Sequence, residues 1–447
     1  MTLRAGFAKV VITPPVGTPM EGYSARQGVS QGVHDDLYAR ALVIDDGTAR
    51  AAIVGCDLLG VDRRLVAAAR ARAAESGAAP ADHIMIGATH THAGPAGLRF
   101  DVDEALCEMT SRLIAGAIIA AARELRPAVL KAGRSALDTV SQNRRHPDWP
   151  IETRLDVLLF DSPDPLREPP VAAVVNYACH ATVLYHTNLL LSGDYAGYAV
   201  RTVERLTGAP ALYLNGACGN INPVWMEQTF SEAERVGTIV GAEAGRLAQE
   251  LRPLGRGQVA WNIRWDELTD RPVTRGRMVD DARIRVASAQ VELPVREFLE
   301  LDEYERRLAG LQERLDALPP EAVAERHEVL QQITRYRTER QVAARGRRTG
   351  AGPHFVRPEV QALGLARDTA ILGLPGEFFV ETADAIRHDT GVPNLLVSCY
   401  TNHYVGYICP REVFDQGGYE AGVTLFGPDA EPEVRRTARA LLKEVTS

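Results

Sequence analysis

The chain has 447 residues, of which 45% are hydrophobic and 24% charged, and its formal net charge is -8. This composition is typical of a soluble globular protein with a large core, built as one α/β domain with insertions or as two to three domains. The acidic balance argues against a nucleic-acid-binding protein, which would usually be basic, and we find no apolar run of membrane-spanning length.

The amino-terminal residues and the cysteines bear on the cellular location of the protein. The apolar part of the first residues is too short for a signal peptide and continues directly into strand-like sequence. The six cysteines contain no CxxC pair, so we expect mostly buried free thiols; they are Cys56, Cys107, Cys179, Cys218, Cys399 and Cys409. We therefore expect a cytoplasmic protein.

Predicted strands and helices alternate in the first part of the chain. Strands are expected over 7–12, 37–45 and 51–57, the last two as a hairpin around Gly47, and helices over 61–76 and 103–125. Asp57 ends its strand, where it can support a site from behind or cap the next helix.

The stretch from His83 to Pro95 organises the rest of the chain. It is an apolar run that ends in Thr-His-Thr-His and breaks at Gly-Pro, a pattern that predicts a buried strand. Because side chains alternate along a strand, we expect His90 and His92 to point the same way, about 7 Å apart. Two imidazoles at the carboxyl end of a buried strand are well placed to hold or serve a metal ion.

Later strands also end in polar residues. Strands are expected near 129–132, 154–160, 171–180, 211–215, 370–377 and 394–398, and helices from Asp194 as N-cap to 206, over 231–251, up to about 389 and from about 431. The run over 171–180 ends in His180, and the one over 370–377 ends in Glu377. The Gly- and Asn-rich turn over 216–223 lacks the lysine of a phosphate loop, so we predict no nucleotide site there.

Residues 295–347 differ from the rest in composition. They are rich in Glu, Arg and Leu and carry Pro319-Pro320 in the middle, which predicts a helical hairpin inserted into a single domain over 1–447. The hairpin can serve self-association, giving a homo-oligomer, or can cover a site. A charged surface hairpin without function is the alternative.

Alternating strands and helices predict an α/β fold with a central, mostly parallel or mixed sheet flanked by helices. In an open sheet of this kind the site lies outside the carboxyl ends of the strands. His90, His92, His180 and Glu377 all fall at such ends. Histidine and carboxylate ligands suit zinc with an open position for water, and on chemistry alone both His90 and His92 would be assigned to the metal.

An ordered set of short motifs resembles the catalytic domain of the neutral ceramidases, zinc-dependent amidases that cut the N-acyl bond of ceramide. The motifs are Thr89-His90-Thr91-His92-Ala93-Gly94-Pro95, Asn143-Arg144, Cys179-His180-Ala181-Thr182, Pro375-Gly376-Glu377-Phe378, and Tyr407-Ile408-Cys409-Pro410-Arg411-Glu412 with Gly418-Tyr419-Glu420. The resemblance covers nearly the whole chain. It implies one zinc ion per chain, held by His90, His180, Glu377 and Tyr407, and a reacting centre lined by His92, Arg144 and Tyr419.

The resemblance also implies a function. It implies that a metal-activated water hydrolyses a linear, non-peptide amide, with His92 moving protons and with Arg144 and Tyr419 stabilising the oxyanion. The substrate would be a small amide or a lipid-like molecule. Neutral ceramidases carry a further carboxy-terminal β-sandwich domain, and the sequence ends at Ser447 before one, so we expect the catalytic domain only.

Other functions remain open at this stage. An esterase, lactonase or deacetylase needs the same activated water. An amidohydrolase barrel also carries His-x-His on its first strand, but usually with a late Asp ligand. A non-catalytic metal-binding protein is the alternative from another class, whereas a serine hydrolase would need a Gly-x-Ser-x-Gly elbow, which is absent from the sequence. Weaker supporting candidates are Asp57, His34 and Asn215.

Overall fold

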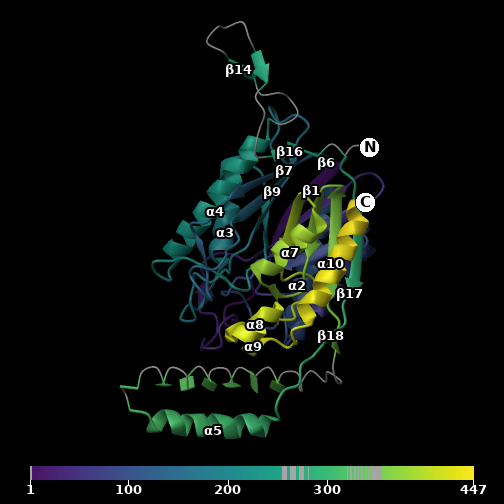
Figure 1. Ribbon diagram of the computed structural model, residues 1–447. Helices are drawn as coiled ribbons and strands as arrows, with labels where there is room; N and C mark the ends of the chain where they lie inside the picture. Colours follow the sequence, from purple (N-terminus) through teal and green to yellow (C-terminus); the bar gives the residue numbers. More distant parts are fainter. Residues whose placement is uncertain are drawn as a thin grey trace.

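Figure 1 shows the computed structural model of the chain. It describes residues 3–253, 276–279, 281–319 and 355–447, the short strands β14 (Val259–Trp261) and β15 (Leu268–Asp270), and scattered residues between 321 and 344.

Three larger mixed sheets form the body of the molecule. The first has the order β5 (Ile84–Ala88), β4 (Arg50–Cys56), β3 (Tyr38–Asp45), β1 (Arg4–Val11) and β6 (Arg126–Pro127). The second has the order β12 (Ala211–Asn215), β10 (Ala172–Tyr177), β9 (Arg154–Asp161), β7 (Val129–Ala136) and β16 (Gly276–Met278). The third has the order β17 (Arg285–Gln290), β20 (Glu359–Ala366), β21 (Thr369–Gly373) and β23 (Asn394–Ser398).

Helices cover each of these sheets. The helices are α1 (Arg63–Glu75), α2 (Glu104–Arg123), α3 (Asp194–Thr207), α4 (Phe230–Leu251), α5 (Leu301–Ala317), α7 (Val380–Thr390), α8 (Arg411–Gln416), α9 (Tyr419–Val423) and α10 (Ala430–Thr446), with a 3-10 turn at Ala81–His83. Helix α2 packs on β1 and β3, α4 on β7 and β9, and α10 on β17 and β20. The predicted α/β class with mixed sheets and flanking helices is confirmed.

Each larger sheet has one parallel pair, and in each the pair lies at an edge. These pairs are β4 with β5, β10 with β12, and β21 with β23, whereas the other pairings in the three sheets are antiparallel. Strands β5, β10 and β12 are buried throughout, as their continuous apolar sequences predict. Strand β12 contacts both β5 and β23, so the three parallel edges meet.

Asn215 ties the carboxyl ends of these pairs together. Its side-chain amide donates to the carbonyls of Thr89 (3.0 Å) and Cys179 (3.1 Å), and its own backbone carbonyl accepts from the amide of Cys399 (2.9 Å). The loops that follow β5, β10 and β23 are thereby fixed around one point. The predicted supporting role of Asn215 is thus met by hydrogen bonds to backbone.

Short two-stranded ladders hold the loops around this point. They pair β2 (Gly32–Val33) with β11 (Leu190–Leu191), β8 (Ser141–Asn143) with β13 (Ile221–Pro223), β18 (Leu293–Pro294) with β19 (Phe355–Val356), and β22 (Glu377–Phe378) with β24 (Tyr407–Ile408).

Two local predictions need correction. Strand β5 ends at Ala88, and His90 lies beyond it with a left-handed φ of 64°, so the alternation of a strand does not orient the histidine pair. The N-cap of α3 is Gly193, and Asp194 is the first helical residue. The buried Asp194 carboxylate instead accepts from the backbone amide of Leu184, which holds the loop after β10 (3.0 Å).

Helix α2 is long and apolar enough, by length and composition, to cross a membrane. From the sequence alone, no apolar run of that length was expected. In the structure α2 packs against α1, β1 and β3, and a buried core helix of a soluble protein meets the same criterion. No further helix among the described residues meets it.

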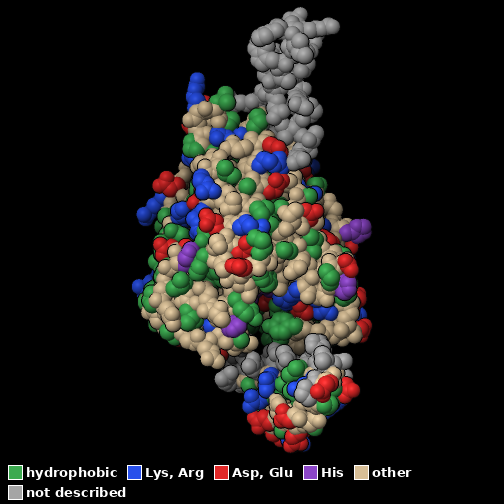
Figure 2. All heavy atoms as spheres, turned by 90° about the vertical axis from the view of Figure 1, so that its left-hand side faces the viewer, with side chains coloured by type: hydrophobic (Ala, Val, Ile, Leu, Met, Phe, Trp, Pro, Cys, Tyr) green, Lys and Arg blue, Asp and Glu red, His purple; other side chains and the backbone are tan. Residues whose placement is uncertain are grey.

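Helix α5 lies within the segment 295–347, for which a helical hairpin was predicted. Figure 2 shows its acidic and basic side chains at the lower end of the molecule, and ion pairs such as Arg307 with Glu303 (2.7 Å) run along the helix. Leucines on the other side form a small cluster with Val329 and Ile333. Much of the predicted second arm lies outside the described residues. The single-domain boundary over 1–447 stays a prediction.

Candidate metal centre

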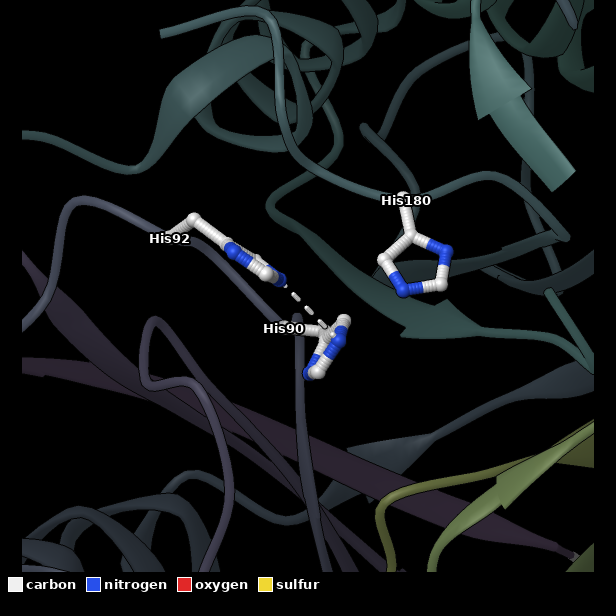
Figure 3. Close-up of side chains that lie close together, drawn as sticks. All are labelled: His90, His92 and His180. Atoms are coloured by element: carbon white, nitrogen blue, oxygen red, sulfur yellow. Dashed lines mark hydrogen bonds between the residues drawn. The ribbon is translucent and has the colours of Figure 1, made fainter. Parts of the chain in front are cut away.

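Three histidines meet at the junction of the sheets, as Figure 3 shows. His90 and His92 lie in the loop after β5, and His180 lies in the loop after β10. One ring nitrogen from each lies within 4.8 Å of the others, and the Nε2 atoms of His90 and His92 are 3.3 Å apart. Among the residues that the structure describes, this is the group that can hold a metal ion.

The hydrogen bonds of two of these rings fix which nitrogen faces the centre. Nδ1 of His90 is 2.7 Å from the carbonyl oxygen of Leu59, and Nδ1 of His180 is 3.0 Å from that of Ile221. Because a carbonyl oxygen only accepts, Nδ1 carries the hydrogen in both rings. In the neutral rings, Nε2 therefore presents a lone pair to the centre.

Glu377 completes this arrangement. Its Oε2 lies 3.2 Å from Nε2 of His180 and 3.6 Å from Nε2 of His90. Burial alone would raise the pKa of the Glu377 carboxyl, but the neighbouring His90 and His180 hold it well below its usual value, so it is ionised. A proton on an Nε2 atom balances this carboxylate when no metal ion is bound, and two imidazoles with a carboxylate are also a donor set that fits a divalent transition metal.

Backbone geometry fixes Glu377. The preceding Gly376 has φ +142°, and a Cβ there would lie 2.4 Å from the carbonyl oxygen of Gly406, so only glycine fits. The hydroxyl of Tyr404 donates to the other carboxylate oxygen of Glu377. The parallel β22–β24 ladder then places Tyr407 directly beside Glu377.

Tyr407 is held from its other side by Arg144. Nη2 of Arg144 donates to the Tyr407 hydroxyl (2.9 Å), and its Nε donates to the buried carboxylate of Glu420 (2.8 Å). Burial raises the pKa of Tyr407 well above its usual value, although the Arg144 charge acts in the opposite direction. Tyr419 as a residue is 57% exposed, and its ring lies 6.0 Å from that of Tyr407, centroid to centroid.

His92 differs from the other two histidines in its surroundings. Its Nδ1 is buried and has no hydrogen-bond partner among the described residues. The ring packs 5.0 Å from that of Tyr23, and a Cβ on Gly22, whose φ is +111°, would lie 2.8 Å from it. Burial and the adjacent His90 and His180 lower the pKa of His92, so the ring is neutral and can accept a proton.

A sequence model described as "Neutral/alkaline non-lysosomal ceramidase, N-terminal" matches residues 4–216. The neutral ceramidase of Pseudomonas aeruginosa is 26% identical to this chain over 95% of the chain and 69% of that protein. The chain is thus similar in sequence to the neutral ceramidases. The neutral ceramidase of Drosophila melanogaster is 26% identical, over 46% of this chain and 32% of that protein.

Solved structures of neutral ceramidases share the fold. The crystal structure of the Pseudomonas aeruginosa enzyme aligns with a TM-score of 0.72 at 21% identity, over 100% of this chain and 75% of that one. A structure described as ceramidase complexed with C2 aligns with a TM-score of 0.70 at 20% identity, over 99% of this chain and 75% of that one. The described strands form open sheets and not a closed barrel, which excludes the amidohydrolase-barrel alternative.

The structure brings the candidate residues together, with two exceptions. His34 stacks on Phe230 at 3.7 Å and pairs with Asp35, away from the histidine cluster. Asp57 neither caps α1, whose N-cap is Asp62, nor touches the cluster. It forms a buried ion pair with Arg40 (2.5 Å) and accepts from the amide of Tyr38 (3.0 Å).

Replacing Asp57 with alanine is expected to destabilise the protein by roughly 3 kcal/mol, because it leaves the buried Arg40 charge without its partner. Urea denaturation would measure the change. The matched control is Glu104→Ala, which removes an exposed ion pair with Arg64 and should cost less than about 1 kcal/mol. Equal effects of the two substitutions would contradict this account.

Sequence reasoning missed two residues that fix the site. Tyr404, which holds Glu377, lies in the aromatic loop after β23, and Glu420 follows Tyr419 and holds Arg144 and Arg145. Burial would raise the pKa of Glu420, but the two arginines lower it. The position of Glu420 directly after the site residue Tyr419 could have predicted its role, since an acidic residue beside a site can balance the charge of a buried arginine.

Proposed function

We propose that this protein hydrolyses an N-acyl amide bond at one zinc ion held by His90, His180, Glu377 and Tyr407. The observation that carries the proposal is the pair of Nε2 lone pairs turned toward the Glu377 carboxylate, an arrangement that a cation would complete. The relatives are neutral ceramidases, so the reaction class is hydrolysis of a non-peptide C–N bond.

A bound zinc ion would bring the pKa of a water toward neutrality and would polarise an acyl carbonyl. The side chains around the ion would then carry out proton transfer and oxyanion stabilisation. His92 is neutral, is partly exposed and lies beside the cluster, so it can take a proton from the attacking water and pass it to the leaving nitrogen. Its Nδ1 has no partner among the described residues, so no hydrogen bond at that atom fixes which nitrogen carries the proton.

Arg144 and Tyr419 serve the developing oxyanion in this proposal. Arg144 keeps its charge, because Tyr407 and Glu420 raise its pKa against the effect of burial. Its guanidinium lies 5.6 Å from the ring centroids of both Tyr407 and Tyr419, so Tyr419 stands next to it on the exposed side. A phenol hydroxyl at this place can donate to an oxyanion that Arg144 also faces.

Replacing Tyr419 with phenylalanine is expected to lower kcat about a hundredfold, because an oxyanion donor is lost, while KM changes little. Steady-state kinetics on an N-acyl amide would measure both constants. Tyr198→Phe, which also removes one phenol hydroxyl but on α3 beside His34, is the control. A rise in KM with kcat unchanged would instead make Tyr419 a substrate-binding residue.

Ceramide and shorter N-acyl amines are the substrates to be tested first. The test begins with the metal content of the purified, unsupplemented protein, followed by chelation and reloading with single divalent ions. About one zinc per chain, together with amide hydrolysis that is lost on chelation and restored by zinc, would support the proposal. Stoichiometric metal without hydrolysis of any amide or ester would support the non-catalytic alternative.

Two further predictions concern the context of the protein. We propose a cytoplasmic location, and we infer self-association through residues 295–347 from their composition. Cell fractionation tests the first. Light scattering of the full chain beside a variant with the exposed Leu330 replaced by glutamate tests the second, and an unchanged mass would remove this face of the insertion as the interface.

A further inference from the structure

A second arginine, Arg99, lies beside the centre on the loop that leads from the histidine pair toward α2. Its side chain is only 18% exposed. The guanidinium carbon lies 4.8 Å from the ring centroid of Phe100 and 4.9 Å from that of Tyr404. Because the Tyr404 hydroxyl donates to Glu377, a single tyrosine ring separates Arg99 from the candidate metal ligand.

Arg99 is charged and its charge reaches the site. Burial would lower the pKa of Arg99, but Glu21, Tyr404 and Glu377 raise it above its usual value. Burial, His90 and His180 lower the pKa of His92, and the Arg99 charge lowers it further. Arg99 therefore acts on the candidate proton carrier as well as on the carboxylate side of the centre.

The two arginines of the site differ in how their donors are used. Arg144 gives Nε to Glu420 and Nη2 to Tyr407. Arg99 gives Nε to Glu21 (2.7 Å), and its two terminal nitrogens make no hydrogen bond within the part of the chain that the structure describes. These terminal nitrogens keep some exposure to solvent, so they are available to a ligand that supplies acceptors.

The chemistry of these donors indicates what such a ligand carries. The two terminal nitrogens of an arginine form a fork that matches the two oxygens of a carboxylate or phosphate. A neutral amide substrate would leave the fork of Arg99 unpaired at the edge of the centre. An anionic group close to the scissile nitrogen would pair with it while the acyl carbonyl lies at the histidine cluster.

We propose that Arg99 selects N-acylated amines that carry an anionic group next to the amide nitrogen, such as N-acyl amino acids. This inference rests on the proposed function and narrows its substrate class. Within it, Arg99 binds the anionic group of the substrate, and Glu21 orients the guanidinium from the other side through its bond to Nε.

Binding to the metal-free protein tests the inference without requiring turnover. Isothermal calorimetry would compare N-octanoylglycine with N-octanoylglycinamide, which differ in the carboxylate alone. We expect the wild-type protein to bind the carboxylate at least about tenfold more tightly, a preference typical of a hydrogen bond between charged partners. A second pair, N-octanoylethanolamine with and without an O-phosphate, distinguishes a phosphate from a carboxylate as the anion.

Arg99→Met keeps the packing on Phe100 and Tyr404 but removes the charge, and it should abolish the preference. Arg99→Lys keeps the charge without the fork, so an intermediate preference is expected. The matched control is Arg112→Met on the exposed surface of α2, which should bind like the wild type. Equal affinities of the wild type for both members of each pair, or an unchanged preference in Arg99→Met, would overturn the inference.

Hydrolysis by the zinc-loaded protein separates this inference from the proposed function. If the zinc-loaded protein cleaves anionic amides with a higher kcat/KM than neutral ones, and Arg99→Met loses this preference, the role of Arg99 and the proposed function are both supported. Cleavage of neutral amides without any preference for anions overturns the role of Arg99 and leaves the proposed function standing. An anion preference in binding without any hydrolysis supports Arg99 and overturns the proposed function.

Discussion

Replacing Glu377 with alanine is expected to remove the metal and to lower kcat/KM by more than about a thousandfold, since the carboxylate is the only anion among the described residues that faces both His90 and His180. Elemental analysis would measure the metal, and kinetics on an N-acyl amide would measure the rate. The fold should survive, because the backbone of Glu377 is held independently by the carbonyl of Gly406 (2.9 Å).

The matched control for this prediction is Glu381→Gln, four residues later on α7. Glu381 is exposed, and its carboxylate accepts from the side-chain amide of Asn220 and lies outside the histidine cluster. This variant should keep its metal and most of its activity. Full metal content in Glu377→Ala would mean that the ion is held by the three histidines alone.

Replacing His92 with alanine is expected to leave the metal content unchanged and to lower kcat about a thousandfold, because the proton carrier is lost. His90→Ala, by contrast, should lose the metal. The structure gives a reason for this division. Metal-bound histidines usually donate their second nitrogen to an oriented acceptor, as His90 and His180 do, whereas Nδ1 of His92 has no partner among the described residues.

The geometry also allows the opposite result, since all three rings lie close enough to share one ion. Metal analysis of His92→Ala decides between the two arrangements. Loss of the metal from this variant would make His92 a ligand and would leave Tyr407 free of the ion. In that case Arg144, which donates to the Tyr407 hydroxyl, would stabilise the phenol and not a metal-bound oxygen.

The sequence was sufficient to locate most strands and the polar residues at their ends. Continuous apolar runs identified β5, β10 and β21, and these strands are buried throughout. His90, His180 and Glu377 follow such strands, so the rule that sites lie at carboxyl ends found them. The rule applies here although only one pair in each sheet is parallel.

What the sequence could not show was how separate sheets meet. Pairing among strands distant in the chain depends on tertiary packing, and one polar residue in a loop carries no periodic signal. The left-handed backbone at His90 also has no signal in the sequence. The alternation expected of a strand placed both histidines on the same side, whereas the strand ends before His90. The roles of Tyr404 and Glu420 were not predicted for the same reason. Tyr404 contacts Glu377, 27 positions away in the chain, and Glu420 contacts Arg144, 276 positions away.

The junction of three sheets has a consequence for folding. The side chains that would hold the ion come from loops after β5 and β10 and from β22, so no single sheet can assemble the centre. The ion could then bind only after all three sheets have folded and packed together. Removing it with a chelator would lower the melting temperature of the whole protein in a single transition. An ion present at a thousand times its dissociation constant would add about 4 kcal/mol to the free energy of unfolding. In a cell starved of metal, the supply of the ion would thus limit how much of this protein survives proteolysis.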